Sequence, residues 1–342
     1  MSNELHKIVA PLLEWYEINK RDLPWRHNPT PYRVWISEIM LQQTRVDPVI
    51  PYYNRFLSAL PTVEDLAKIP QDELMKLWEG LGYYSRARNL QKAAQQICED
   101  KKFPDDFDGW RSLPGIGEYT AGAICSIALG LPTPAVDGNV LRVLSRVLGS
   151  RRDIMHSSVK KDFTEELSAV YPQGAASSFT QGLMELGALI CLPNGKPKCQ
   201  ICPLSVLCVA HTENLTDEIP VKTPKKGRKI EKKTVFILRC GNKIALQKRP
   251  SEGLLADLWE FPNLPGEMSE KEASEAFNAL SVHRLSDSTH IFTHIEWHMI
   301  GYELKVANNG ESYTWLTAEE VLRNKAIPSA YRAYIDFLKT MI

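Results

Sequence analysis

The first residue of this sequence that could do chemistry is an acid in apolar surroundings. Glu38 lies in the helical pattern of residues 34–41, which only Ser37 and Glu38 interrupt. Burial in such a pattern would raise the pKa of its carboxyl group, so that it could hold a proton near neutral pH and act as a general acid. The plainer interpretation is a surface glutamate at a helix edge, since most glutamates are exposed.

A second acid, Asp137, stands directly before a helical pattern whose apolar residues begin at Val140. It could be an ordinary N-cap, because aspartate is favoured at that position. It could also be a carboxylate that the helix N–H groups keep ionised, facing positive charge that develops on a substrate. One protonated acid and one carboxylate are the pair that cleaves a glycosidic bond.

The stretch LPGIGEYTAGA, residues 113–123, predicts a glycine turn that opens a helix. The N–H groups around Gly115 and Gly117, together with the helix dipole, could bind a DNA phosphate without reading sequence. It could equally be a turn that only connects two packed helices.

Four cysteines, Cys191, Cys199, Cys202 and Cys208, fall within 18 positions. No apolar stretch is long enough to span a bilayer, and the N-terminal pattern is an amphipathic helix rather than a signal peptide. We therefore expect a cytoplasmic protein, in which disulfides are rare and clustered cysteines hold a metal. The spacing leaves zinc and a 4Fe–4S cluster both open.

Composition is that of an ordinary soluble protein of about two domains. The 342 residues are 44% hydrophobic, and 41 basic residues balance 41 acidic ones. A local excess of positive charge lies between residues 222 and 233. Its members are Lys222, Lys225, Lys226, Arg228, Lys229, Lys232 and Lys233, against the single acid Glu231. This stretch could contact phosphate or could be a solvated tether.

The periodicity predicts a multidomain chain. Residues 1–210 form an all-α helix-hairpin-helix domain with the four-cysteine loop, residues 211–232 a basic linker, and residues 233–342 an α+β domain. In this last domain, Cys240-Gly241-Asn242 is expected to turn a hairpin. Alternation through residues 290–298 would place His290, His294, Glu296 and His298 on one strand face, where we interpret them as solvated rather than metal-binding.

Several motifs together resemble the helix-hairpin-helix DNA glycosylase superfamily with a cysteine-ligated cluster. They are LPWR (23–26), SEIMLQQTRV (37–46), GLGYYSRARNL (80–90), LPGIGEYTAGA (113–123), VDGNVLRVL (136–144), MELGALIC (184–191) and the four cysteines. MLQQT and GLGYYSRARNL are highly specific and indicate the branch that removes adenine mispaired with 8-oxoguanine or guanine. The resemblance covers nearly the whole chain.

The resemblance implies a role for each matching residue. Glu38 would protonate adenine N7, Asp137 would stabilise the oxocarbenium ion, and Asn139 would help to position it. Relatives that also cut the strand carry a lysine at the position of Tyr119, so tyrosine there implies a monofunctional enzyme that leaves an abasic site. The adenine pocket would hold Trp25, Arg26, Leu41 and Gln181. Residues that wedge beside or inspect 8-oxoguanine would be Gln43, Thr44, Leu81, Tyr83, Phe292, Thr293 and His294.

The resemblance also implies a 4Fe–4S cluster on the four cysteines, double-stranded DNA as partner, and a monomer. Cys191 and Cys199 are separated by one more residue than the family pattern. The last domain resembles a Nudix domain, yet residues 280–285, LSVHRL, stand where its metal-binding acids should be. A recognition domain is therefore favoured over a pyrophosphatase. A glycosylase/lyase for oxidised pyrimidines and a catalytically silent DNA-binding module would also fit parts of this pattern.

Overall fold

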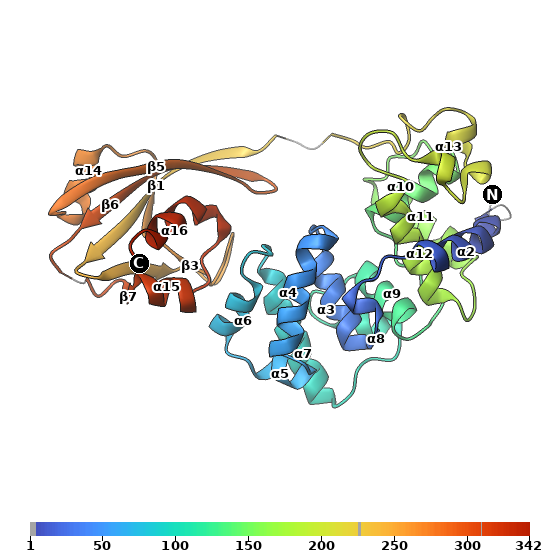
Figure 1. Cartoon of the computed structure of the whole chain (residues 1–342), viewed down its shortest axis with the longest axis horizontal. Helices are drawn as coiled ribbons and strands as arrows, with labels where there is room; N and C mark the ends of the chain where they lie inside the picture. The colour runs from blue at the N-terminus through green and yellow to red at the C-terminus, as the bar shows by residue number, and fades with distance from the viewer. Residues whose placement is uncertain (1–4, 225–226, 309) are drawn as a thin grey trace. The chain divides into compact units, whose positions relative to one another are not determined.

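The computed structural model describes residues 5–224, 227–308 and 310–342, and Figure 1 labels its elements. The chain divides into two compact units. Unit 1 is Met1–Ala67 with Asn89–Pro224, and unit 2 is Lys68–Arg88 with Lys225–Ile342. The predicted combination of an all-α domain and an α+β domain is confirmed.

The boundaries differ from the predicted ones in two places. Parts of the expected linker, residues 211–232, belong to the two units: Ile219 is buried in unit 1, and strand β1 of unit 2 already begins at Lys229. Two of its lysines, Lys225 and Lys226, lie outside the described residues. Segment Lys68–Arg88, predicted as part of the helical domain, groups with unit 2. Short helical patterns do not reveal which neighbour will cover them.

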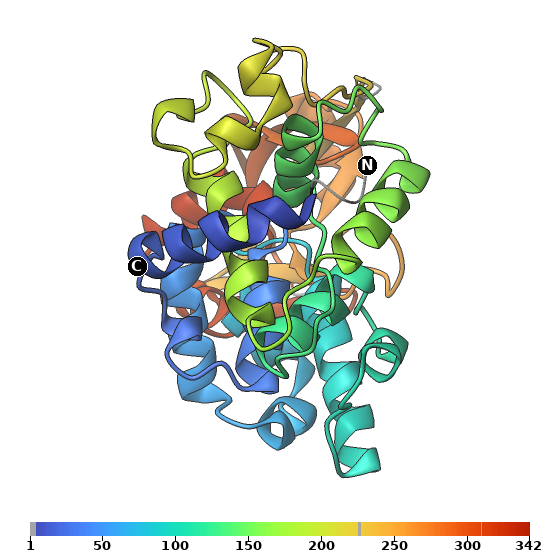
Figure 2. The same cartoon turned by 90° about the vertical axis from the view of Figure 1, so that its right-hand side faces the viewer.

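Unit 1 is built from helices, with α5 and α7 crossing its boundaries. The elements are η1 (His6–Ile8), α2 (Val9–Asn19), η2 (Pro24–Arg26), α3 (Pro31–Leu41), α4 (Val46–Ala59), α5 (Val63–Lys68), α7 (Ser85–Asp100), α8 (Phe107–Ser112), α9 (Glu118–Ile127), α10 (Gly138–Val147), α11 (Ser157–Ser168), α12 (Ala176–Leu189), η3 (Cys199–Ile201), η4 (Ser205–Leu207) and α13 (Val209–Thr212). Helix α2 packs across α12, and the two lie side by side in Figures 1 and 2.

Two glycines bring the chain into close contact around the predicted acids. A side chain at Gly122 of α9 would place Cβ 2.1 Å from the carbonyl oxygen of Pro134, just before Asp137. A side chain at Gly187 of α12 would meet Cβ of Asn139 at 2.6 Å. Both approaches require glycine, and together they hold the start of α10 against α9 and α12.

Unit 2 contains α6 (Gln71–Trp78) and a mixed sheet whose two faces pack against different helices, one against Ala273 and the other against Val321, Tyr334 and Leu338. Its other elements are β1 (Lys229–Cys240), β2 (Lys243–Lys248), β3 (Trp259–Glu260), β4 (Asn263–Pro265), α14 (Glu270–Phe277), β5 (Ser281–Ile291), β6 (Ile295–Lys305), β7 (Thr314–Thr317), α15 (Ala318–Asn324), η5 (Ser329–Tyr331) and α16 (Arg332–Lys339). The strand order is β3-β2-β1-β6-β5, with β1 and β6 parallel.

The sheet explains several sequence predictions. Cys240 pairs with Lys243 across the expected hairpin turn, where Gly241 has φ of 59°. The expected single strand face of histidines is wrong, because β5 ends at Ile291 and β6 begins at Ile295. His290 pairs with Trp297 and so points to the opposite face from Glu296 and His298, whose side chains hydrogen-bond at 2.8 Å.

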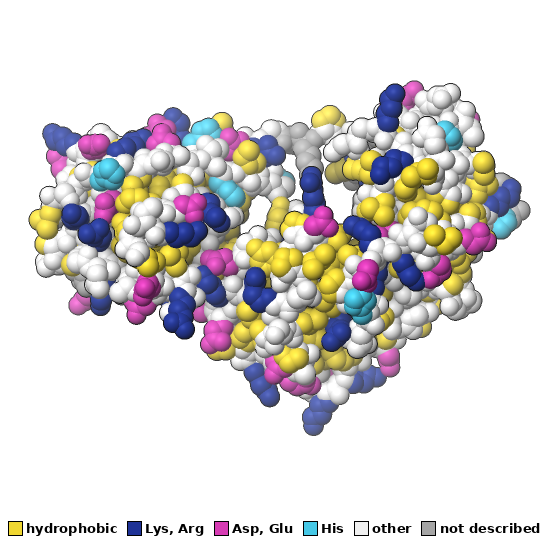
Figure 3. All heavy atoms as spheres, viewed as in Figure 1, with side chains coloured by type: hydrophobic (Ala, Val, Ile, Leu, Met, Phe, Trp, Pro, Cys, Tyr) yellow, Lys and Arg dark blue, Asp and Glu magenta, His cyan; other side chains and the backbone are white. Residues whose placement is uncertain are grey.

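The structure also shows where the two segments compared with the Nudix motif lie. Residues 281–285 belong to strand β5, and Glu272 closes a capping box at the start of α14, accepting from the N–H of Ser269 at 2.7 Å. Lys and Arg side chains lie among Asp and Glu over the visible face of each unit (Figure 3). Among the described helices, none is both long and apolar enough to cross a membrane.

Candidate active site

A pocket of about 450 Å³ opens within unit 1 between α3, α9, α12, η2 and the start of α10. It gathers residues that are far apart in the sequence. Of the predicted site residues, its walls contain Trp25, Arg26, Glu38, Leu41, Thr44, Tyr119, Asp137, Asn139 and Gln181. The two acids and the predicted adenine contacts therefore share one cavity.

Glu38 is buried on the inner face of α3, a helix that begins with Pro31 and a Thr30 side chain capping the N–H of Arg33. Burial raises the pKa of its carboxyl group to about 7, and the nearby charge of Asp137 contributes to that rise. The hydroxyl of Tyr119 donates to Glu38 Oε2 at 2.7 Å and opposes that shift. A carboxyl with this pKa can donate a proton at neutral pH.

Tyr119 is itself held protonated. Burial raises the pKa of its hydroxyl well above 10, and the charges of Glu38 and Asp137 add to the effect. Its hydroxyl also lies 3.9 Å from the sulfur of Met184. The resemblance counted Tyr119 among the catalytic residues as the replacement for a lyase lysine, and the structure adds its hydrogen bond to Glu38.

Asp137 is the N-cap of α10. Its Oδ1 accepts from the N–H groups of Asn139 at 2.9 Å and Val140 at 2.8 Å, and its Oδ2 accepts from Asn139 Nδ2 at 2.8 Å. Burial raises the pKa of Asp137, while these three bonds and the charge of Arg142 oppose it. Because the donors favour the charged form, Asp137 is the better anion of the two acids.

Arg142 supports this arrangement from the next turn of α10. Its Nη2 donates to Asn139 Oδ1 at 2.9 Å and to the carbonyl oxygen of Gly187 at 2.7 Å. Its Nε donates to the carbonyl oxygen of Cys191 at 2.7 Å. A planar guanidinium thus connects the Asn139 amide to the start of the cysteine loop. Sequence reasoning missed this residue, although an arginine inside an apolar helical pattern is a usable signal.

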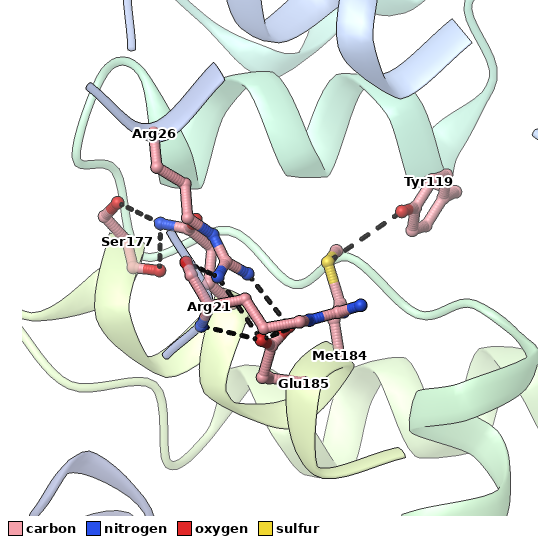
Figure 4. A network of polar contacts seen from close by, with 7 residues as sticks. Arg21, Arg26, Tyr119, Ser177, Met184 and Glu185 are labelled. Atoms are coloured by element: carbon pink, nitrogen blue, oxygen red, sulfur yellow. Dashed lines mark hydrogen bonds and ion pairs between the residues drawn. The ribbon is translucent and has the colours of Figure 1, made fainter. Parts of the chain in front are cut away.

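A buried acid that sequence reasoning also missed orders the far wall (Figure 4). Glu185 Oε1 accepts from Arg21 Nε at 2.7 Å, and Oε2 accepts from Arg26 Nη2 at 3.0 Å. Burial raises the pKa of Glu185, but the two arginines outweigh it and lower the pKa to about 2. Arg26 Nε then donates to Gln181 Oε1 at 2.9 Å, which fixes the amide of Gln181 in the pocket.

The glycine turn joins α8 to α9 as a helix-hairpin-helix element. Gly115 has φ of 76°, and a side chain there would place Cβ 2.6 Å from Cβ of Asn89. At Gly117, the N-cap of α9, a Cβ would meet nothing within 4 Å. The first-turn N–H groups of α9 lack partners within the helix, so this end can accept an anion.

The four predicted cysteine ligands lie in the loop that follows α12. Burial raises the pKa of the Cys202 thiol to about 12, and the charges of Cys191, Cys199 and Cys208 contribute to that shift. Arg146 Nη1 donates to Cys191 Sγ at 3.3 Å. In the described part of the chain, no three or more His, Cys, Asp or Glu side chains are placed to share a single metal ion.

The residues predicted to meet the opposite base are distributed over both units. Thr44 lines the pocket of unit 1, and Gln43 beside it has φ of 60°. In unit 2 the hydroxyl of Tyr83 lies 3.0 Å from Thr293 Oγ1. Phe292 packs edge-on against Trp297 at 4.9 Å. Leu81 is buried, and His294 accepts the N–H of Lys229 with its carbonyl oxygen.

Known proteins share both parts of this chain. Residues 36–169 match the family model described as HhH-GPD superfamily base excision DNA repair protein, and residues 234–337 match the NUDIX domain model. A thermostable thymine-DNA glycosylase aligns with a TM-score of 0.56 and 32% identity, covering 62% of this chain and 98% of that one. Endonuclease III in a non-covalent DNA complex aligns with a TM-score of 0.54 and 25% identity. The alignment covers 63% of this chain and 98% of that one. The helical unit is thus that of a base-excision DNA glycosylase.

Curated relatives narrow the class. The adenine DNA glycosylase of Buchnera aphidicola subsp. Schizaphis graminum is 38% identical over 84% of this chain and 85% of its own length. The human adenine DNA glycosylase is 33% identical over 97% of this chain and 74% of its own length. The chain belongs to the adenine DNA glycosylase family.

Proposed function

We propose that this protein is a monofunctional DNA-repair enzyme that hydrolyses the glycosidic bond of adenine mispaired with 8-oxoguanine or guanine in double-stranded DNA. The observation that carries the proposal is the pocket that Glu38 and Asp137 share. Glu38 is buried, and three hydrogen bonds from Asn139 and Val140 favour the charged form of Asp137. Such a pair suits the cleavage of a glycosidic bond. The adenine DNA glycosylase relatives supply the substrate class.

In the proposed reaction, adenine leaves the base stack and enters the pocket, which costs a few kcal/mol. Glu38 donates its proton to N7 of adenine as the bond between the base and C1′ breaks. Asp137 stabilises the oxocarbenium ion that remains, and Asn139 positions the Asp137 carboxylate. Water then adds at C1′ and Glu38 recovers a proton, leaving an abasic site and free adenine.

The strand is not expected to be cut, because the pocket presents Tyr119 where a lyase presents an amine. A phenol has no amine nitrogen and therefore cannot form a Schiff base with the sugar. In the same proposal, Trp25, Arg26, Leu41 and Gln181 hold adenine, with Glu185 and Arg21 ordering Arg26.

The remaining predicted residues would meet the DNA on either side of the reaction. The N–H groups around Gly115 and Gly117 bind a phosphate. Gln43, Thr44, Leu81, Tyr83, Phe292, Thr293 and His294 meet 8-oxoguanine or fill the space that adenine vacates.

Cys191, Cys199, Cys202 and Cys208 would hold a 4Fe–4S cluster. A donor set of four sulfurs with an adjacent guanidinium fits such a group. A four-iron cluster is larger than one ion, so its ligand sulfurs stand further apart than those around zinc. The cluster would supply a cross-link for the loop after α12. We propose a monomeric protein that acts in the cytoplasm.

The test is single-turnover cleavage of a duplex with one adenine opposite 8-oxoguanine. Alkali after the reaction should cut the adenine strand, and borohydride during the reaction should trap no stable protein–DNA adduct. High-yield trapping would favour a glycosylase/lyase, and absence of cutting after alkali would overturn the proposal. Release of pyrophosphate from oxidised dGTP would instead support a nucleotide hydrolase.

A further inference from the structure

Segment Lys68–Arg88 is joined to unit 1 at both ends of its sequence, but its side chains bind within unit 2. The first contact is at the start of α6. Asp72 Oδ2 accepts from the indole Nε1 of Trp259 at 3.2 Å and from Lys325 Nζ at 3.2 Å, and Oδ1 accepts from Lys248 Nζ at 3.3 Å. One carboxylate therefore binds three side chains from three separate parts of the Nudix-like domain.

The ring of Trp259 also contacts both cations. Lys325 Nζ lies 4.3 Å from the ring centre of Trp259, and Lys248 Nζ lies 5.8 Å from it. A cation held over a ring and bonded to a carboxylate has few positions available. Asp72 thus fixes the start of α6 against a defined surface.

The second contact is at the other end of α6. Lys76 Nζ donates to the carbonyl oxygens of Leu322 at 2.7 Å and Lys325 at 3.1 Å, which belong to the C-terminal end of α15. Glu79 Oε1 accepts from the N–H of Ile327 at 3.0 Å. The lysine satisfies carbonyls that a helix end leaves without partners. Both ends of α6 are therefore attached.

The chain after α6 is stiffened up to the lesion-recognition residues. Arg86 Nη2 donates to the carbonyl oxygens of Leu81 at 2.9 Å and Gly82 at 3.1 Å, and the indole of Trp78 donates to Gly82 at 3.1 Å. Tyr83 has φ of 47°, and its hydroxyl reaches Thr293 at 3.0 Å. An orientation set at α6 is thus transmitted to Tyr83.

We propose that Asp72 is a positioning residue for discrimination of the opposite base: by holding α6 on Trp259, Lys248 and Lys325, it sets the place of Tyr83 against Thr293. The inference rests on the proposed function and deepens it. Asp72 acts through Tyr83 and not on adenine. Its loss should therefore lower the preference for 8-oxoguanine over guanine and leave the chemical step intact.

The test compares the full-length protein with Asp72→Asn on two duplexes that differ only in the base opposite adenine, 8-oxoguanine or guanine. The measured quantity is the ratio of the two second-order rate constants for adenine release at limiting protein. Asp72→Asn should lower this ratio by about fivefold. The matched control is Glu73→Gln, which removes the same charge from the exposed neighbouring position. Its ratio should equal that of the wild type.

Two further variants separate positioning from general damage. Trp259→Phe removes the indole N–H that binds Asp72, so it should also lower the ratio of the rate constants for the 8-oxoguanine and guanine duplexes. In the double variant Asp72→Asn/Tyr83→Phe, the effects should not add, because both changes act on one contact. The rate at saturating protein should stay at the wild-type value for both duplexes.

The inference is overturned if Asp72→Asn leaves the ratio unchanged, if both duplexes slow equally, or if its effect adds fully to that of Tyr83→Phe. These outcomes are distinct from failure of the proposed function. If the proposed function is wrong, the wild-type protein itself releases no adenine from either duplex, and the inference about Asp72 is then overturned as well.

Discussion

Each unit buries a glutamate almost completely, and the two are used differently. Glu38 in unit 1 is 5% exposed and Glu260 in unit 2 is 4% exposed. Glu260 is bonded on both oxygens: Oε1 accepts from Gln247 at 2.9 Å, and Oε2 accepts from Tyr331 at 2.6 Å and from Arg249. Glu38 instead lines a pocket, where its pKa is raised. Burial alone does not make an acid reactive. At Glu38, burial raises the pKa more than the charge of Arg26 lowers it, and the carboxyl group faces a cavity.

The same contrast separates the acids within the pocket. Glu185 is buried like Glu38, but two arginines hold its pKa low. It is therefore a fixed anion that orders the wall, whereas Glu38 can exchange a proton. Three buried acids in one chain thus differ in role: Glu38 is the proposed proton donor, Glu185 anchors the pocket wall, and Glu260 is the centre of a packed polar core.

The largest expected effect is on the rate of adenine release and comes from changing Glu38, the acid that lines the pocket. Glu38→Gln should lower single-turnover adenine release by about 10³-fold, because the proton donor is lost. It should not lower the melting temperature, since the buried carboxyl is replaced by a neutral side chain of the same shape. A large loss of stability would place Glu38 with Glu260 as a structural acid.

The matching change in unit 2 should affect stability instead. Glu260→Gln leaves the partly buried Arg249 without its carboxylate partner and should cost about 3 kcal/mol in the free energy of unfolding of unit 2. Denaturant unfolding measures this, while adenine release at saturating DNA serves as the control. An unchanged midpoint would show that the polar core does not depend on that charge.

A smaller effect on the rate of adenine release is expected from Arg142, which supports Asn139 and through it Asp137. Arg142→Gln removes the bonds to Gly187 and Cys191 and weakens the support of Asn139, so adenine release should slow by about tenfold. Arg152→Gln, at an exposed ion pair with Asp162, is the control. Equal slowing in both variants would remove Arg142 from the support of Asp137.

The smallest effect concerns pH. Adenine release needs protonated Glu38, so its rate should fall as pH rises through the folded pKa of about 7. The hydrogen bond from Tyr119 lowers that pKa, so Tyr119→Phe should move the basic limb of the profile upward by less than about one pH unit. A downward shift would contradict the assigned hydrogen bond.

The free energy of unfolding should also depend on the protonation of Glu38. The ordinary pKa of 4.5 lies below the folded value, so the folded chain binds the proton more tightly than the unfolded chain. The stabilising contribution of protonated Glu38 is complete below about pH 4.5 and is lost as pH rises to about 7. Glu38→Gln should remove this part of the pH dependence of unfolding.

Local features of this protein follow from the sequence alone. The apolar pattern around Glu38, the glycine turn at Gly115, the Asp137 N-cap and the Cys240–Asn242 hairpin each depend on neighbours within a few residues. Those neighbours fix helix faces, caps and turns, and the pattern also separates an all-α region from an α+β region.

Tertiary structure alone decided which distant groups meet. Glu185 binds Arg21 across 164 residues, Tyr119 binds Glu38 across 81, and segment Lys68–Arg88 packs with the second unit. A pattern of apolar residues shows that a face is buried, but it does not identify the surface that covers it. The pKa of a buried acid depends on that surface, so the difference between the raised pKa of Glu38 and the lowered pKa of Glu185 exists only in the folded chain.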